Sequence, residues 1–156
     1  MEFKYLDGGR VAAGFRGESG DCVTRAVAIA TGQGYRDVYE ALSDGCRSQR
    51  GPRLSARAAT RRSKVSARDG VMVKRKWFKD YMAALGWTWT PTMGIGTGCQ
   101  VHLTDGELPM GRLIVSVSKH YTAVIDGVIH DTHDPQRPAS DLVGGRCVYG
   151  YWRQGR

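Results

Sequence analysis

The dipeptide Asp126-Gly127 constrains the fold of this chain more than any other feature, because it lies between two runs of alternating apolar residues. Such a dipeptide favours the two-residue turn of a β-hairpin, and that turn determines which residues pair. Counting outward from it, Thr122 faces Asp131 and His120 faces His133. Paired residues place their side chains on one face of a sheet. We therefore predict that His120 and Asp131 are diagonal neighbours on one face, within hydrogen-bonding reach.

Periodicity in the rest of the chain predicts helices before strands. The first helix carries the apolar stripe Val23, Ala26, Val27 and Ala30, with Asp21 as its N-cap and Gly32 as its stop. A second stripe runs through Tyr35, Val38, Tyr39 and Leu42, and a third helix is expected over 74–85. Strands are expected near 3–6, 87–89, 101–103, 112–118, 121–125, 128–131 and 148–152. This order predicts an α+β fold, with N-terminal helices packed on a C-terminal antiparallel sheet.

The size of the chain suits one domain over residues 1–156. It has no run of about 20 apolar residues, so we expect no membrane partner. No basic leader followed by an apolar run opens the sequence, which predicts a cytoplasmic location. The four cysteines are widely spaced, so we expect them to stay reduced rather than form disulfides: Cys22, Cys46, Cys99 and Cys147.

The net charge of +8 is concentrated in one segment. Residues 44–76 contain eleven Lys or Arg against two Asp, which leaves the rest of the chain close to neutral. Residues 44–70 also lack a firm apolar pattern, so we interpret 44–76 as a basic lid or insertion. Such a segment attracts an acidic partner or a nucleic acid, and the simpler interpretation is a solvated loop.

Cys22 begins the first predicted helix, a position that favours nucleophilic chemistry. Unpaired N–H groups and the helix dipole stabilise a thiolate at a helix N-terminus. The expected roles are Cys22 as nucleophile, His120 as its acid–base partner, and Asp131 as the group that orients the imidazole. The backbone N–H of Cys22 is a natural donor to an oxyanion. No cofactor and no metal is required by these roles.

The same residues resemble the papain-like cysteine hydrolases. Gly20-Asp21-Cys22-Val23 opens a helix, His120 begins a strand, and an acid lies on the following strand. That superfamily uses Cys, His and Asp or Asn in this chain order, with the cysteine at the head of a helix packed on an antiparallel sheet. The resemblance implies a peptidase, amidase or isopeptidase that works through an acyl-thioester on a peptide or protein substrate.

A second resemblance extends over nearly the whole chain, to uncharacterised proteins of phages and bacteria. It is carried by Asp7-Gly8-Gly9-Arg10, by Gly20-Asp21-Cys22-Val23-Thr24-Arg25-Ala26 and by His130-Asp131-Thr132-His133-Asp134-Pro135. It implies a phage or prophage origin, with the host cytoplasm as the location, and no particular activity.

The chain departs from the papain pattern near the cysteine. Papain-type enzymes place a Gln six residues before the cysteine to complete the oxyanion hole, and Arg16 occupies that position here. Arg16, Ser19 or a loop amide are therefore the candidates for the second donor. Val23 replaces the aromatic residue that follows the cysteine in that family.

Several alternatives remain open at the sequence level. Cys22 can be a small buried core residue, and Asp134 or His133 can replace Asp131 as the orienting group. Cys99-x-x-His102 and His130-x-x-His133 have plausible zinc spacing, but the hairpin register places His130 and His133 on opposite faces.

Three functions compete on this basis. The first is a cysteine hydrolase. The second is a nucleic-acid-binding or regulatory protein that acts through residues 44–76. The third is an inactive papain-like module that binds a partner in the old cleft.

Overall fold

The computed structural model describes residues 1–48, 66–137 and 145–155. Within them it has three helices, α1 (Cys22–Thr31), α2 (Tyr35–Ser48) and α4 (Lys76–Ala84). Its six strands are β1 (Glu2–Tyr5), β2 (Trp87–Pro91), β3 (Arg112–Val117), β4 (His120–Ile125), β5 (Val128–Asp131) and β6 (Val148–Gln154). The predicted α+β class is confirmed. Most of the predicted basic insertion, residues 49–65, lies outside the described residues.

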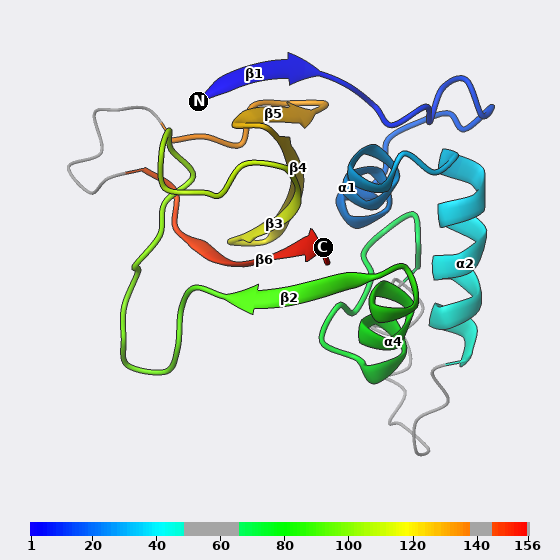
Figure 1. Cartoon of the computed structure of the whole chain (residues 1–156). Helices are drawn as coiled ribbons and strands as arrows, with labels where there is room; N and C mark the ends of the chain where they lie inside the picture. The colour runs from blue at the N-terminus through cyan, green and yellow to red at the C-terminus, as the bar shows by residue number, and fades with distance from the viewer. Residues whose placement is uncertain (49–65, 138–144, 156) are drawn as a thin grey trace.

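The strands form one curved sheet with the order β1-β5-β4-β3-β6-β2 (Figure 1). The prediction of a C-terminal antiparallel sheet is wrong at one edge, where the opening strand β1 pairs in parallel with β5. At the other edge β2, which follows the helices, pairs antiparallel with β6. Edge β1 is held by packing as well as by hydrogen bonds, because Phe3 packs against an apolar cluster that includes Ile129 of β5. Such a long-range pairing leaves no local signal in the sequence.

The hairpin formed by β4 and β5 has the predicted register. Ile125 pairs with Val128, Val124 with Ile129, and Ala123 with His130. Asp126 and Gly127 have φ values of 49° and 80°, both left-handed, as a type I′ turn requires. Gly127 adopts this conformation without the steric penalty of a Cβ atom.

The sheet is buried on both faces, by two separate apolar clusters. Helices α1, α2 and α4 cover one face, where Val27 and Ala30 pack in one cluster with Ile114 and Ala123 of the sheet. The opposite face holds a second cluster built from Leu103, Leu113, Val115, Val117, Val124, Ile129 and Val148. Strand β3 contributes to both clusters, which explains why five of its six residues are buried and why neither of its faces is exposed to solvent.

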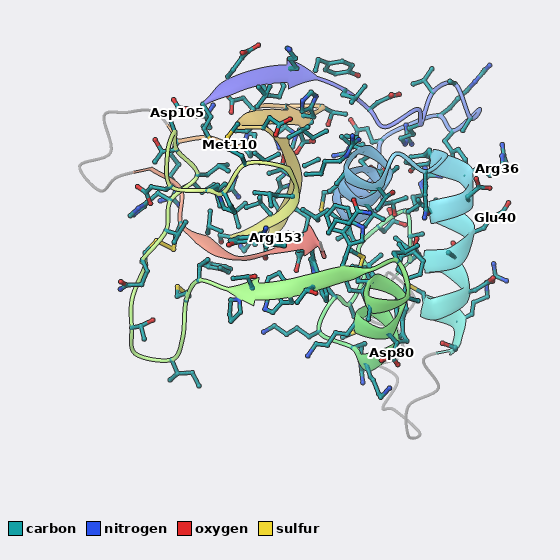
Figure 2. The ribbon with its side chains drawn as sticks, viewed as in Figure 1. Arg36, Glu40, Asp80, Asp105, Met110 and Arg153 are labelled. Carbon is teal, nitrogen blue, oxygen red and sulfur yellow. A yellow bond between two sulfur atoms is a disulfide. The ribbon has the colours of Figure 1, made fainter. Side chains whose placement is uncertain are left out.

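The helices follow their predicted stripes. In α2, Tyr35, Val38 and Leu42 are buried, while Arg36 and Glu40 point outward (Figure 2). Helix α1 ends at Gly32, which has a left-handed φ of 75° and donates its N–H to Ala28 O at 2.9 Å. Helix α4 starts at Lys76 rather than residue 74, because Arg75 has an extended backbone. Among the described helices, none is long and apolar enough to cross a membrane.

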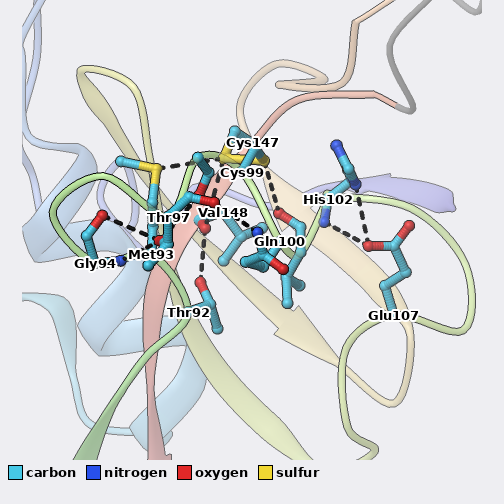
Figure 3. The surroundings of a disulfide bond; sticks show 12 residues. Thr92, Met93, Gly94, Thr97, Cys99, Gln100, His102, Glu107, Cys147 and Val148 are labelled. Atoms are coloured by element: carbon cyan, nitrogen blue, oxygen red, sulfur yellow. Dashed lines mark hydrogen bonds and ion pairs between the residues drawn. A yellow bond between two sulfur atoms is a disulfide. The ribbon is translucent and has the colours of Figure 1, made fainter.

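The prediction that all cysteines stay reduced is wrong, because Cys99 and Cys147 form a disulfide (Figure 3). The expected strand at 101–103 is only a single bridge between His102 and Cys147. Backbone bonds on either side hold the two segments together, Val148 N to Val101 O at 2.8 Å and Leu103 N to Arg146 O at 2.7 Å. The tertiary pairing therefore brings together two sulfurs that are 48 residues apart in the sequence.

We expect this disulfide to stabilise the fold by closing a long loop in the unfolded chain. For a separation of 48 residues the loop-entropy estimate is about 4 kcal/mol. Chemical unfolding with and without a thiol reductant measures the difference. The Cys99→Ser/Cys147→Ser variant should match the reduced protein and lose sensitivity to the reductant, whereas Cys46→Ser should behave like wild type. Four reactive thiols in unfolded, unreduced protein would contradict the pairing.

Candidate active site

The structure brings Cys22, His120 and Asp131 together where three elements end. Cys22 is the first residue of α1, His120 the first residue of β4, and Asp131 the last residue of β5. The predicted hydrogen bond is present, with His120 Nε2 2.6 Å from Asp131 Oδ2. Because Nε2 faces the carboxylate, Nδ1 is the ring nitrogen left to bond the Cys22 sulfur. The His120 and Asp131 side chains are 10% and 3% exposed.

The surroundings of Cys22 favour its thiolate. Burial alone would raise the pKa of Cys22, but the hydrogen bond from His120 and the backbone amide of Tyr121 oppose that effect. The positive charges of His120 and Arg25 also stabilise the anion, and the pKa of Cys22 falls below its ordinary value. Burial raises the pKa of the other free thiol, Cys46. The two free cysteines therefore differ in the direction of their shifts.

The imidazole of His120 is held in its charged form. Burial would lower its pKa, but the hydrogen bond and negative charge of Asp131, together with those of Cys22, raise it to about 9. Burial works to raise the pKa of Asp131, but the bond to His120, its charge and the Thr132 amide lower it. The favoured state is a thiolate–imidazolium pair supported by a carboxylate.

A tight turn and the side chain of Arg146 position His120 at the start of β4. A tight turn joins β3 to β4, and Lys119 within it has a left-handed φ of 56°. The guanidinium of Arg146 donates to Ser118 O in this turn and to Pro135 O, the latter at 2.9 Å. Arg146 thus ties the segment before His120 to the segment after Asp131. Sequence reasoning missed Arg146, since nothing local in the sequence marks its two acceptors.

Asp21 does not act as the predicted N-cap. Its backbone is not extended, and its side chain makes no capping hydrogen bond to α1. The carboxylate, in a residue 1% exposed, instead accepts hydrogen bonds from Ser19 Oγ at 2.7 Å, the Tyr35 hydroxyl and Arg25. It also forms an ion pair with Arg10, whose Nε lies 3.3 Å away. Burial and the bond to Asp21 raise the pKa of Tyr35. The carboxylate is used to neutralise buried guanidinium groups rather than to cap the helix.

Sequence reasoning also missed Arg25. It is a charged residue in a helix whose other residues from 23 to 30 are apolar or small, and it is 7% exposed. Its position four residues after Asp21 places the two side chains on the same helix face. That spacing, inside an otherwise apolar stretch, was the available signal for a buried ion pair.

The three predicted oxyanion donors have different environments. The N–H of Cys22 lies in the first turn of α1, where amides have no intrahelical partner. The Ser19 hydroxyl donates its proton to Asp21. The side chain of Arg16 is exposed, and its backbone carbonyl accepts a bond from Arg10. The Cys22 amide is thus the predicted donor whose position suits the role without rearrangement.

The alternative orienting groups are placed differently. Asp134 is exposed and accepts the Gln136 amide at 2.9 Å, as a turn residue does. The exposed His133 ring lies 4.8 Å from the His120 ring, centroid to centroid. Asp131 is the carboxylate that contacts His120.

The residues with zinc spacing do not form a cluster. Cys99 is in the disulfide, and the side chain of His102 lies 3.2 Å from Glu107. The ligand atoms of His120, Asp131 and His133 lie within 4.8 Å of one another. We interpret the first two as a hydrogen-bonded pair, because they bond each other at 2.6 Å.

The described end of the basic segment lies against α1. Ala67 is fully buried, and its carbonyl accepts a 2.7 Å bond from Thr24 Oγ1. Arg68 donates to Glu18 O at 3.2 Å, on the loop before Cys22. Residues 67 and 68, close to the point where the described chain resumes, therefore lie beside α1 and the loop before it.

Comparisons with known proteins leave the site to be judged on its own geometry. No protein-family model matches the chain, and no match was found among curated proteins or solved structures.

The raised pKa of His120 gives a direct test of this geometry. NMR titration of the imidazole should show a midpoint near 9. Asp131→Asn removes the charge and the acceptor that favour the imidazolium, so its midpoint should fall by about one unit or more. Asp134→Asn, a matched change on an exposed aspartate, should leave the midpoint in place. Equal effects of the two variants would argue against the His120–Asp131 bond.

Proposed function

We propose that this protein is a cysteine hydrolase that cuts a peptide, amide or isopeptide bond through an acyl-thioester on Cys22. One observation carries the proposal: a cysteine with a lowered pKa meets an imidazole whose pKa is raised to about 9 and which a buried carboxylate holds at 2.6 Å. Such pKa perturbations together with this geometry are typical of catalytic nucleophiles.

The proposed reaction has two halves. The Cys22 thiolate attacks the carbonyl carbon, and the oxyanion that forms accepts from the Cys22 N–H. His120 gives its proton to the leaving amine as the C–N bond breaks, which leaves a thioester and a neutral imidazole. His120 then takes a proton from water, whose oxygen attacks the thioester and releases the carboxylic acid. The products are an amine, an acid and the restored thiolate–imidazolium pair.

Asp131 supports both halves without taking the proton. Its hydrogen bond to Nε2 keeps Nδ1 directed at the sulfur, and its charge stabilises the imidazolium. We extend the proposal to a papain-like arrangement of the fold. It is supported by a cysteine at the head of a helix that packs on the sheet, and by a histidine and an acid on adjacent strands.

We also propose that segment 44–76 is a lid or a docking element for an acidic partner. Its net positive charge supports this role, as does the contact of Ala67 and Arg68 with α1 and the loop before Cys22. Binding of a polyanion would then weaken steeply with salt.

The proposed location is the cytoplasm, of the host if the protein is phage-encoded. Thiols in that compartment act to reduce disulfides, so the redox state of the Cys99–Cys147 bond is a test of this location. Free thiols are counted after rapid acid trapping from the native cell. Four free thiols indicate a reducing compartment, and two indicate an oxidising one.

The first experiment compares the alkylation rates of the two free thiols. At pH 6 to 7 iodoacetamide should label Cys22 at least about ten times faster than Cys46, because thiolate is the reactive species. His120→Ala should abolish this advantage, and Cys46→Ala should leave it intact. Equal, slow labelling of both thiols would contradict the proposal.

The second experiment looks for turnover. Against a mixed library of peptides, amides and isopeptides, Cys22→Ala should lose all thiol-dependent cleavage, and His120→Ala should fall by about 10²–10⁴-fold. Mass spectrometry of quenched wild-type protein should show an acyl adduct on Cys22. Fast, selective alkylation without an adduct or cleavage would favour the inactive binding module.

A further inference from the structure

We propose that Arg25 is a positioning residue for this reaction, linking the helix that carries Cys22 to the carboxylate that orients His120. The inference rests on the proposed function. Arg25 lies one helical turn after Cys22 and bridges two buried carboxylates: one terminal nitrogen contacts Asp21 Oδ1, and the other lies 3.4 Å from Asp131 Oδ1.

The two oxygens of Asp131 have separate partners. Oδ2 faces His120 at 2.6 Å, and Oδ1 faces Arg25 and the Thr132 amide, the latter at 2.7 Å. A carboxylate held at both oxygens cannot rotate away from the imidazole. Arg25 therefore restricts the orientation of Asp131, and through it the tautomer of His120.

The buried and half-buried charges of this cluster alternate in sign. The order is Arg10, Asp21, Arg25, Asp131, His120 and Cys22, with each charge next to an opposite one. In the thiolate–imidazolium state three positive charges balance three negative ones. Breaking a buried pair leaves an uncompensated charge, which is far more costly than losing a surface pair. The charge of the active-site pair is thus coupled to Arg25 and Asp21.

If the Arg25–Asp21 ion pair were purely structural, removing either charge would not shift the pKa of Cys22 in opposite directions. Arg25 lowers the pKa of Cys22 by its charge, as a minor contribution beside His120. Removing the guanidinium therefore makes both the thiolate and the neutral imidazole harder to form. Removing the Asp21 charge leaves the positive charge of Arg25 and Arg10 less neutralised, and makes both easier to form.

Titration of Cys22 and His120 depends on every charged or titratable group that faces them. Arg25 from α1, Tyr121 from β4 and Asp131 from β5 act on the pair directly, and the His133 ring lies beside His120. Asp21 acts through its contact with Arg25, and Arg10 and Tyr35 act through theirs with Asp21. Of the variants below, Arg25→Met and Asp21→Asn each remove one formal charge and leave the other groups in place.

The experiment measures the alkylation rate of Cys22 from pH 4 to 11 in the full-length protein. The acid limb of the rate profile reports formation of the Cys22 thiolate, and the alkaline limb reports loss of the imidazolium proton of His120. Arg25→Met should move both limbs to higher pH, by about one pH unit. Asp21→Asn should move both limbs to lower pH. Arg25→Lys keeps the charge and should restore the limbs toward wild type, with a lower plateau rate because an ammonium cannot bridge two carboxylates in one plane.

Arg112, the first residue of β3, offers a matched control because its side chain contacts the same helix, α1. Its guanidinium donates to Ala30 O and Ile29 O, at the opposite end of α1 from Cys22. Arg112→Met should cost stability without moving either limb. If Arg25→Met does not fold, the downward shift in Asp21→Asn still tests the proposal.

The outcomes separate this inference from the proposed function. Limbs that stay in place in both Arg25→Met and Asp21→Asn, or that move in the same direction, would overturn the positioning role while leaving the hydrolase intact. A wild-type Cys22 with no fast labelling would overturn the hydrolase. The role of Arg25 is then judged by NMR, where Arg25→Met should raise the pKa of His120 and Asp21→Asn should lower it.

Discussion

The close packing of α1 against the sheet determines most of what this molecule can do. The contact is made by small residues, Ala26 and Ala30 on the helix and Ala123 on β4, all at most 2% exposed. Small side chains at a contact let two elements approach closely. That approach carries the start of α1, with Cys22, to the start of β4, with His120. A bulky residue at any of these positions would push the helix away from the sheet and so increase the distance between the Cys22 sulfur and the His120 imidazole.

A second constraint arises because charged groups are buried beside this apolar contact. Asp21, Arg25 and Asp131 are all less than 10% exposed, and burying such groups is costly unless each is paired and hydrogen-bonded. Their alternation of sign pairs each charge with an opposite one, although Nε of Arg25 is buried without a hydrogen-bond partner. It also makes the site electrostatically connected, so that a change at Asp21 is felt at Cys22 without any contact with substrate. We regard this connection as the reason for retaining a buried ion pair where apolar residues would pack more simply.

The contacts on the face of the sheet opposite the helices also help to position the site. The second apolar cluster and the Cys99–Cys147 disulfide hold the segments that lead into β6. The residue before Cys147 is Arg146, whose guanidinium joins the turn before His120 to the segment after Asp131. The stability of this region and the placement of the imidazole therefore share one set of contacts.

Local rules were sufficient for most of the helices and strands and for half of the site. The stripe of α1, its stop at Gly32 and the hairpin around Asp126-Gly127 depend on neighbours a few residues apart, and the register alone placed His120 beside Asp131. Tertiary structure decided the parallel pairing of β1, the disulfide, the bridge at Arg146 and the use of Asp21 as a counterion instead of a cap. Each of these joins groups that are distant in the sequence or that compete for several partners. Periodicity and spacing describe one segment at a time, whereas the choice among partners depends on which groups burial brings together and which charges must then be neutralised.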